Sequence, residues 1–496
     1  MTDLKKAVAR IEAGDRLRFV NVPDGFDAFV CADLARALAR GAEGKPAVFV
    51  HVARDAQRSA AVREALRFAA PEVEALDIPG WDCQPYDRVS PNAAISARRM
   101  TALARLARSR SSAERPRIVT TTVDCLIQRV PPLEAVAADT FSAAPGNVVH
   151  MDDLARWLEA NGFLRSSAVR ETGEYAQRGG ILDLYAPGMP TPVRLDFFGD
   201  TLESIRSFDP ESQRTVGQLR ALDLVPMSEL RLTSESMRRF RQAYTTRFGG
   251  QTRGDHLYEA ISEGRRFQGA EHWLPLFYPR MGTLFDYVGA APLMLDQLAD
   301  EAAGERAAQI ADYYDARKFA YDAAPAEATY KPLEPSELYL SVEEWRGQIE
   351  ARGQARFSPF TTPEDAAKNE IDCAARAGRD FAPERNDENA NVFEAAVDHV
   401  KALRGAGKTV VIAGWSDGSC ERLGSVLAEH GLRDLRSVPS LPAALALGKS
   451  AAALAVLGVE HGFETDGLVV IGEQDILGDR MVRRRRKTKH TENLLG

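Results

Sequence analysis

The chain has 496 residues, of which 45% are hydrophobic and 27% are charged, and its formal net charge is −8. This length exceeds what one hydrophobic core can organise and predicts three or four domains with the composition of an ordinary globular protein. The net negative charge excludes a protein that coats nucleic acid with its whole surface, although a local basic patch is compatible with it. The N-terminus has no apolar signal segment and no stretch approaches the ~20 apolar residues of a membrane span, so we expect a cytoplasmic protein without a membrane partner.

Residues 1–138 alternate short apolar runs with amphipathic patterns. The runs at 17–22, 46–52 and 117–127 predict buried strands. The stretches DAQRSAAVREALRFAA and AISARRMTALARLARS predict helices with one apolar stripe each. Because strands alternate with helices, we expect a largely parallel sheet with helices on its faces.

Residues 139–226 show a different pattern, rich in glycine and in alternating apolar and polar residues. A helix is expected at 151–161, followed by strands at 181–185, 193–198 and 202–208. This segment predicts a small, strand-rich α+β domain inserted into the first domain.

The rest of the chain divides into four segments. Residues 227–350 return to helical patterns with scattered aromatic residues, and residues 351–392, which include DFAPERNDENAN, are expected to form a linker. Residues 393–480 again alternate strands and helices, which predicts a separate, compact α/β domain. Residues 481–496 are expected to form a basic tail.

The turn at residues 21–28 stands where a nucleotide-binding loop would stand, between a strand and an amphipathic helix. The pattern G-x-x-x-x-G-K-[ST] needs glycines where this chain has Asn21 and Phe26, lysine where it has Asp27, and a hydroxyl where it has Ala28. A carboxylate at this point would repel phosphates. We therefore expect a degenerate loop that binds no nucleotide.

Other chemistry is weakly indicated. Gly407-Lys408-Thr409 leads into a strand instead of leaving one, and Gly448-Lys449-Ser450 also lacks the strand–loop–helix context of a phosphate loop. The five cysteines are scattered without a C-x-x-C pair, and the eight histidines are isolated. We expect reduced thiols and predict no catalytic residues, no metal site and no cofactor.

A basic run lies near the end of the chain. It is either a solvated linker or a contact with nucleic-acid phosphates, and the sequence leaves both interpretations open. Its cations are Arg483, Arg484, Arg485, Arg486, Lys487 and Lys489.

The predicted strand at 193–198 carries a testable pattern, because side chains alternate across a sheet with period two. We expect the inward face to hold Val193, Leu195 and Phe197. We expect the exposed face to hold Arg194, Asp196 and Phe198. The alternative is that Phe198 folds under the Gly-Asp turn that follows it.

One long segment carries a specific resemblance. The stretch GEYAQRGGILDLYAPGMPTPVRLDFFGDTLESIRSFDPESQRT resembles the UvrB-homology segment of the bacterial transcription-repair coupling factors (the Mfd family) and, with more differences, UvrB itself. GAEHWLPLFY at 269–278 is similar to a second motif of that family, with Ala270 in place of isoleucine. EHGFETDGLVVIGEQDILGDRMVRRRR resembles the end of the family's third N-terminal domain, so the resemblance covers essentially the whole chain.

The resemblance implies a fold and a role. The fold would be a degenerate UvrB-like P-loop or RecA-type parallel-sheet domain with the inserted domain, followed by the separate α/β domain. The role would be non-catalytic recruitment of UvrA through Arg178, Arg194 and Phe198. UvrB keeps an intact phosphate loop, so the loop at 21–28 favours the coupling factors.

Further implications concern the full-length family. Its RNA-polymerase-binding domain and its ATP-driven double-stranded-DNA translocase would lie beyond this chain, which we expect to be a fragment. Two alternatives stay open: a UvrB-like ATP-dependent helicase subunit of the excision nuclease, and a purely structural brace for the absent motor.

Overall fold

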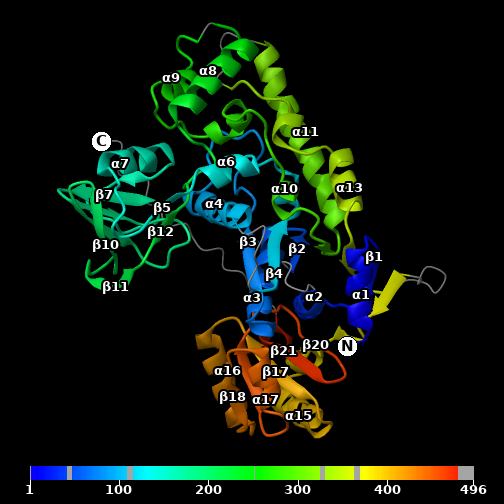
Figure 1. Cartoon of the computed structure of the whole chain (residues 1–496). Coiled ribbons are helices and arrows are strands. Elements are labelled where there is room, and N and C mark those ends of the chain that lie inside the picture. The colour runs from blue at the N-terminus through cyan, green and yellow to red at the C-terminus, as the bar shows by residue number, and fades with distance from the viewer. Residues whose placement is uncertain are drawn as a thin grey trace.

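The computed structural model describes residues 2–41, 47–108, 115–250, 252–323, 330–361 and 369–478. Four regions can be followed in Figure 1: a central parallel sheet whose first four strands are blue to cyan, an inserted strand-rich domain in teal and green, a helical region in green and yellow, and a C-terminal α/β domain in orange and red. The architecture is mixed α/β, as the sequence predicts. Within these ranges no helix is long and apolar enough to cross a membrane, and no group of side chains could hold a metal ion.

The central sheet has seven strands, all parallel, in the order β15-β1-β14-β13-β2-β4-β3. Its inner strands are buried on both faces, which is why they read as continuous apolar runs. The strands are β1 (Arg16–Val20), β2 (Val48–Ala53), β3 (Glu74–Ile78), β4 (Arg117–Thr122), β13 (Leu293–Leu295), β14 (Gln354–Phe357) and β15 (Glu370–Asp372).

Helices cover both faces of this sheet and build two cores. One face, with Phe49 and Ile118, packs against the first group of helices. The other face, with Val50 and Val119, packs against the second group. The first group is α1 (Thr2–Glu12), α2 (Asp27–Gly41) and α3 (Ala56–Ala69). The second includes α4 (Ala93–Arg108), α5 (Val123–Ile127), α6 (Leu133–Ala138), α10 (Leu284–Val288), α11 (Ala299–Ala323), α12 (Pro335–Leu338) and α13 (Val342–Glu350).

The helical region also includes α8 (Ser234–Phe248), α9 (His256–Ser262) and the 3-10 helix η1 (Ala270–Leu276). The strand predicted at 117–127 ends early, because residues 123–127 form α5. Thr122 caps that helix by accepting a hydrogen bond from the backbone N–H of Cys125 at 3.3 Å.

The segment 351–392, predicted to be a linker, instead supplies strands to two sheets. β14 lies between β1 and β13, and β15 lies at the edge beside β1. β14 was missed because it carries polar residues into the core: Gln354 is fully buried and its Nε2 donates to the carbonyl of Ile349 at 2.7 Å. A buried amide with an internal partner is compatible with a strand, but it lacks the apolar signal that predicts one.

The inserted domain is built on a six-stranded sheet in the order β11-β10-β9-β8-β7-β6, antiparallel except for the β6–β7 pair. It has its own core around Leu182, Leu195 and Phe197. Its chain enters through β5 and leaves through β12, and these two strands pair with each other, Phe141 opposite Leu224.

The elements of the inserted domain follow the chain in simple order. They are β5 (Phe141–Ala143), α7 (Met151–Ala160), β6 (Leu164–Arg165), β7 (Glu174–Arg178), β8 (Ile181–Leu184), β9 (Val193–Phe198), β10 (Thr201–Phe208), β11 (Thr215–Leu219) and β12 (Leu222–Leu224).

The C-terminal domain has a six-stranded mixed sheet in the order β16-β20-β21-β17-β19-β18. Its strands are β16 (Arg376–Ala377), β17 (Thr409–Gly414), β18 (Leu435–Ser437), β19 (Ala452–Val456), β20 (Phe463–Glu464) and β21 (Leu468–Gly472). Its helices are α14 (Ala382–Asn386), α15 (Val392–Gly405), α16 (Asp417–Glu429), α17 (Leu441–Ala446) and α18 (Glu473–Leu477).

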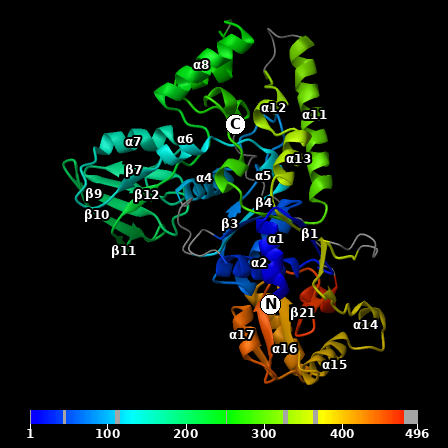
Figure 2. The same cartoon turned by 45° about the vertical axis from the view of Figure 1, so that its right-hand side comes forward.

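This domain has its own sheet and its own core, and it also packs against the central domain, a contact that the sequence analysis did not predict. It lies directly below α2 and α3 in Figure 1 and below α2 in Figure 2, and one continuous apolar cluster includes residues of both domains. The rings of Phe26 and Phe29 each lie 5.0 Å from the ring of Phe463, measured between centroids. The sequence hides this contact, because each domain shows a complete strand–helix pattern and nothing local marks the face that docks.

Candidate functional site

The loop between β1 and α2 lies at the carboxyl end of the central sheet, where open parallel sheets bind ligands. Asn21 adopts a left-handed conformation (φ 55°), and its amide donates to Asp372 on the edge strand β15 at 2.8 Å. Phe26 turns towards the C-terminal domain, and Asp27 and Ala28 are buried. All four residues of the degenerate pattern therefore make structural contacts within the chain.

Gly25 explains how the loop lies so close to the neighbouring domain. Its φ is 93°, and a Cβ built there would stand 3.1 Å from Cγ1 of Val459. A side chain at this point would be strained by the backbone and crowded by the C-terminal domain. The loop thus packs closely against the C-terminal domain of the same chain.

An arginine from α3 lies beside the position that a nucleotide loop gives to lysine. Arg58 is 9% exposed and pairs closely with the buried carboxylate of Asp27. It also lies 3.4 Å from Asp24 and 3.6 Å from Asp296. Burial alone lowers the pKa of Arg58, but the nearby carboxylates, Asp27 first, outweigh that effect and raise it, so the guanidinium stays charged.

Two further buried groups belong to this cluster. Burial raises the pKa of Asp296 to about 6, although Arg58 and Arg54 oppose the shift. Burial also lowers the pKa of His51 on β2 to about 4, so this histidine is neutral near pH 7. The Arg58 cation at the loop is thus matched by carboxylates of the chain itself.

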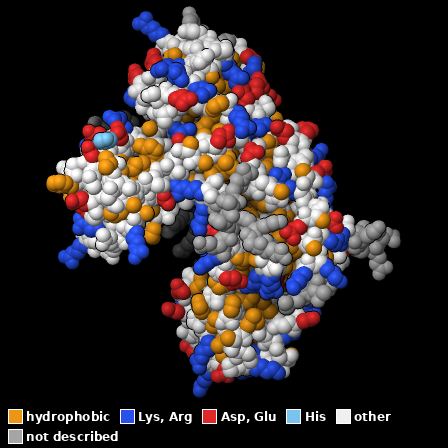
Figure 3. Space-filling view, in the orientation of Figure 1, with side chains coloured by type: hydrophobic (Ala, Val, Ile, Leu, Met, Phe, Trp, Pro, Cys, Tyr) orange, Lys and Arg blue, Asp and Glu red, His pale blue; other side chains and the backbone are white. Residues whose placement is uncertain are grey.

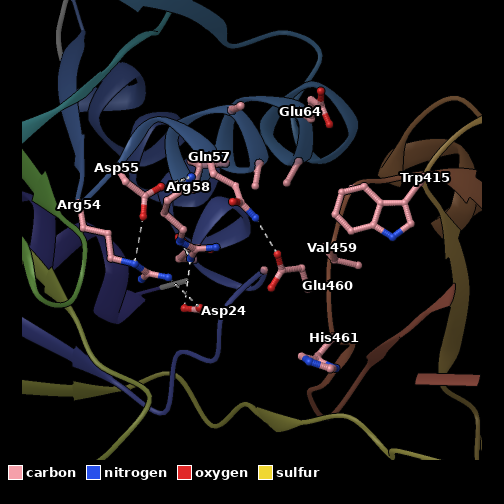
Figure 4. A pocket seen from close by; sticks show the side chains of 17 residues that line it. Asp24, Arg54, Asp55, Gln57, Arg58, Glu64, Trp415, Val459, Glu460 and His461 are labelled. Carbon is pink, nitrogen blue, oxygen red and sulfur yellow. Dashed lines mark hydrogen bonds and ion pairs between the residues drawn. The ribbon is translucent and has the colours of Figure 1, made fainter. Parts of the chain in front are cut away.

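A cavity of about 480 Å³ opens between this cluster and the C-terminal domain. Figure 4 shows its walls: Gln57 and Glu64 project from α3, Val459, Glu460 and His461 lie opposite, and the Trp415 ring closes one side. The sequence analysis did not identify this cavity, because its walls come from segments about 400 residues apart.

The outer face of the inserted sheet is the second candidate. The β7–β8 hairpin places Arg178 opposite Ile181, and the next strand places Asp196 opposite Ile181 on the same face. Phe198 lies two residues further along β9 and is 77% exposed. The alternation predicted for β9 is confirmed for Val193, Leu195 and Phe197, which are buried, and for Phe198, which does not fold under the turn.

The turn between β7 and β8 needs its two glycines. Gly179 has a φ of 58°, and a Cβ built at Gly180 would lie 2.9 Å from the carbonyl oxygen of Phe197. The Arg-Gly-Gly sequence thus brings β8 close to β9 and presents Arg178 at the edge of the exposed face.

Arg194 departs from the expectation of an exposed residue. Its side chain is 21% exposed, and it makes a two-pronged ion pair with Asp183 at 2.7 and 2.8 Å. Its guanidinium also lies 4.9 Å from the centre of the Phe208 ring. At this end of the sheet a small apolar cluster of Val169, Ala176 and Phe208 covers the outer face, so the period-two rule alone overestimates exposure.

Asp196 is also partly covered, because it accepts hydrogen bonds from Arg206 at 2.8 and 2.9 Å. The sequence analysis missed Ile181 and Asp183 as members of this face. Their signal was present in the Ile-Leu-Asp-Leu strand, where they share one parity and the buried leucines share the other.

Other motifs prove structural or fall outside the described residues. Lys408 donates to Glu464 at 2.6 Å and to the carbonyl of Thr465. The backbone carbonyl of Lys449 accepts from Arg404. The basic run Arg483–Lys489 lies outside the described residues.

Comparisons with known proteins connect the fold to a family. A family model described as the UvrB interaction domain matches residues 141–230. The transcription-repair-coupling factor of Haemophilus influenzae is 28% identical over 419 residues, which cover 84% of this chain and 35% of the relative. Its counterpart from Escherichia coli is 29% identical over 423 residues, with the same coverage of 84% and 35%. The chain is related to the transcription-repair-coupling factors.

The relation concerns their N-terminal region, as the sequence predicts. The chain spans 35% of the length of the two relatives just named. A third relative, the transcription-repair-coupling factor of Myxococcus xanthus, is 35% identical over 296 residues. These residues cover 57% of this chain and 24% of the relative. The outer face of the inserted sheet lies entirely inside the segment that matches the family model.

Proposed function

We propose that this chain is the UvrA-recruiting, non-catalytic module of a transcription-repair coupling factor. The observation that carries the proposal is Phe198, a large aromatic side chain that is 77% exposed on a well-packed sheet. It lies within the segment matching the UvrB interaction domain, beside Arg178 and Ile181. In Figure 3 hydrophobic side chains reach the surface at the outer edge of the inserted domain.

The physical reason favours a protein partner. A soluble domain gains nothing from an exposed phenylalanine, whereas aromatic and arginine residues commonly anchor protein interfaces. Arg178 is exposed, one of its Nη atoms donates to the carbonyl of Ser167, and its remaining N–H groups suit a partner carboxylate. Arg194 contributes as a partly buried residue that Asp183 holds in place, with a side chain that is 21% exposed.

The β1–α2 loop supports the non-catalytic half of the proposal. Asp27 and Arg58 neutralise each other where phosphates would need a free cation, and Phe26 packs on Phe463. We regard the domain as a degenerate relative of the P-loop ATPases that keeps the scaffold for its packing. In the full-length family, contacts with RNA polymerase and double-stranded DNA, and ATP-driven translocation, would belong to parts beyond this chain.

The test is a quantitative pull-down or calorimetric titration with purified UvrA. The Phe198→Ala variant should lose about 2 kcal/mol or more of binding free energy, about 30-fold in affinity, as interface anchors do. Its melting temperature should stay near that of the parent, because an exposed side chain leaves no cavity.

Phe319 on α11 offers a matched control, because it is the same residue type and is 78% exposed in another region of the chain. Phe319→Ala should leave UvrA binding unchanged. Equal losses for the two variants, or no loss for Phe198→Ala, would mean that the binding surface is elsewhere.

A further inference from the structure

The cavity between α3 and the C-terminal domain has an apolar floor and a polar rim. Ala60, Ala61 and Ala65 of α3 line it with methyl groups, and the Trp415 ring forms a flat aromatic wall. A Cβ built at Gly458 would lie 2.8 Å from Oε2 of Glu64 and 3.3 Å from the Trp415 ring. The carboxylate and the indole therefore flank the same glycine.

The charge around this cavity is unbalanced. Its lining contains two guanidinium groups and the imidazole of His461. It also contains five carboxylates: Asp24, Asp27, Asp55, Glu64 and Glu460. Asp24, Asp55 and Asp296 lie within 3.6 Å of Arg54, and Asp27 pairs with Arg58, so both cations are already matched.

Two carboxylates on the rim have no cation against them in the described part of the chain. Glu460 accepts a hydrogen bond at 3.0 Å from the neutral amide of Gln57. No ion pair among the described residues includes Glu64. The cavity therefore presents negative charge on two opposite walls, as Figure 4 shows.

Three buried polar atoms of residues that line the cavity lack hydrogen-bond partners within the described chain. One is Oδ1 of Asp27, whose side chain is only 3% exposed and lines the cavity. The others are Nε1 of Trp415 and Nε of Arg58, which lies 3.6 Å from Oδ1 of Asp296. Such atoms are expensive to leave unpaired, so they favour a bound group that donates to Asp27 and accepts from the two N–H groups.

These features describe the chemistry of the occupant. A cation with an aliphatic stem can lay its methylenes on the alanines and its charge against the ring of Trp415 and the carboxylates. A backbone carbonyl next to such a side chain can accept from Nε1 of Trp415. Anionic ligands are disfavoured, because they would face the unmatched carboxylates of Glu64 and Glu460.

We propose that this interdomain cavity binds an arginine or lysine side chain of a basic polypeptide segment. The site lies on different elements from the outer face of the inserted domain, so we expect its occupation to leave UvrA binding unchanged. The loop that would bind an anionic phosphate in an ATPase therefore borders a site for a cation in this chain.

The test is calorimetric titration of the full chain with an end-blocked tetra-arginine peptide. The double variant Glu64→Gln/Glu460→Gln should bind at least tenfold more weakly, and Trp415→Leu about threefold more weakly. The matched control is Glu429→Gln, an exposed glutamate of α16 in the same domain, which should bind like the parent. UvrA binding should be the same in all four proteins.

The chain's own run at 483–489 is one possible source of the cation. A second parent protein, in which serine replaces the six cations of that run, separates the two sources. If this protein binds the peptide more tightly than the natural chain does, the run competes for the cavity. If the two proteins bind the peptide equally, the cation comes from an external segment. Absence of binding in both parents, or equal binding by Glu64→Gln/Glu460→Gln and Glu429→Gln, overturns the proposal.

Discussion

The β1–α2 loop and the outer face of the inserted sheet are built on opposite principles. At the loop, charged groups are buried and find partners inside the chain, Asp27 on Arg58 and Asp296 on Arg54 and Arg58. At the outer face, an apolar ring is exposed and lies at the end of a strand whose other apolar residues are buried. Buried charges with internal partners indicate a structural role, whereas an exposed aromatic without an internal role indicates a partner.

The largest effect should come from breaking the buried pair at the loop. Asp27→Ala leaves Arg58 buried beside fewer carboxylates and should cost about 3–4 kcal/mol of unfolding free energy. Chemical denaturation measures this loss. The double variant Asp27→Ala/Arg58→Met should recover much of it, because the uncompensated charge is gone. A loss below about 1 kcal/mol for the single variant would show that the loop is solvated and still able to accept a ligand.

The second largest effect should be a pH dependence of the unfolding free energy that originates at the loop. The pKa of Asp296 is about 6 in the folded chain, whereas an unperturbed aspartate has a pKa of 3.8. The folded state therefore binds the proton of Asp296 more tightly than the unfolded state does. Its contribution to stability is therefore present at low pH and is lost as pH rises through about 6. Relative to Asp296→Asn, the parent should lose about 2 kcal/mol between pH 4 and pH 7. Parallel stability curves for the two proteins would contradict the raised pKa.

The outer face has its own internal contrast between two arginines. Arg194→Ala should destabilise the protein by about 1–2 kcal/mol, because Asp183 is buried and loses its two-pronged partner. Any loss of UvrA binding must then be measured well below the melting temperature. A stability change near zero would mean that Asp183 is solvated without its arginine.

Arg178→Ala should give the smallest change in stability, within about 0.5 kcal/mol, because the residue is exposed. It should nevertheless weaken UvrA binding by about 1 kcal/mol or more. A titration and a melting curve on the same sample check both statements. If Arg178→Ala lowers stability more than Arg194→Ala, the roles assigned to the two residues are reversed.

Much of the fold was predictable because the relevant signals are local. The strands of the inserted domain at 181–184, 193–198 and 201–208 coincide closely with the predicted ranges, since alternation records which residues face the core. β14 was not predictable in this way, because Gln354 is buried through a hydrogen bond instead of through an apolar side chain.

The candidate sites divide along the same line. Phe198 could be placed on the outer face from parity alone, and the structure agrees. The partial burial of Arg194 depends on Phe208 and Val169, which reach it only in three dimensions. The pairing of Asp27 with Arg58 joins two helices whose residues are 31 positions apart, and no local pattern announces it.

The pairing of β5 with β12 has a consequence for how this protein is assembled. The inserted domain is joined to its host by two adjacent, hydrogen-bonded strands, so its two ends lie side by side. A domain attached in this way can be gained or lost by a gene without separating the chain ends of the host. The sequences of the host sheet and of the inserted domain at 141–224 can therefore change independently of each other.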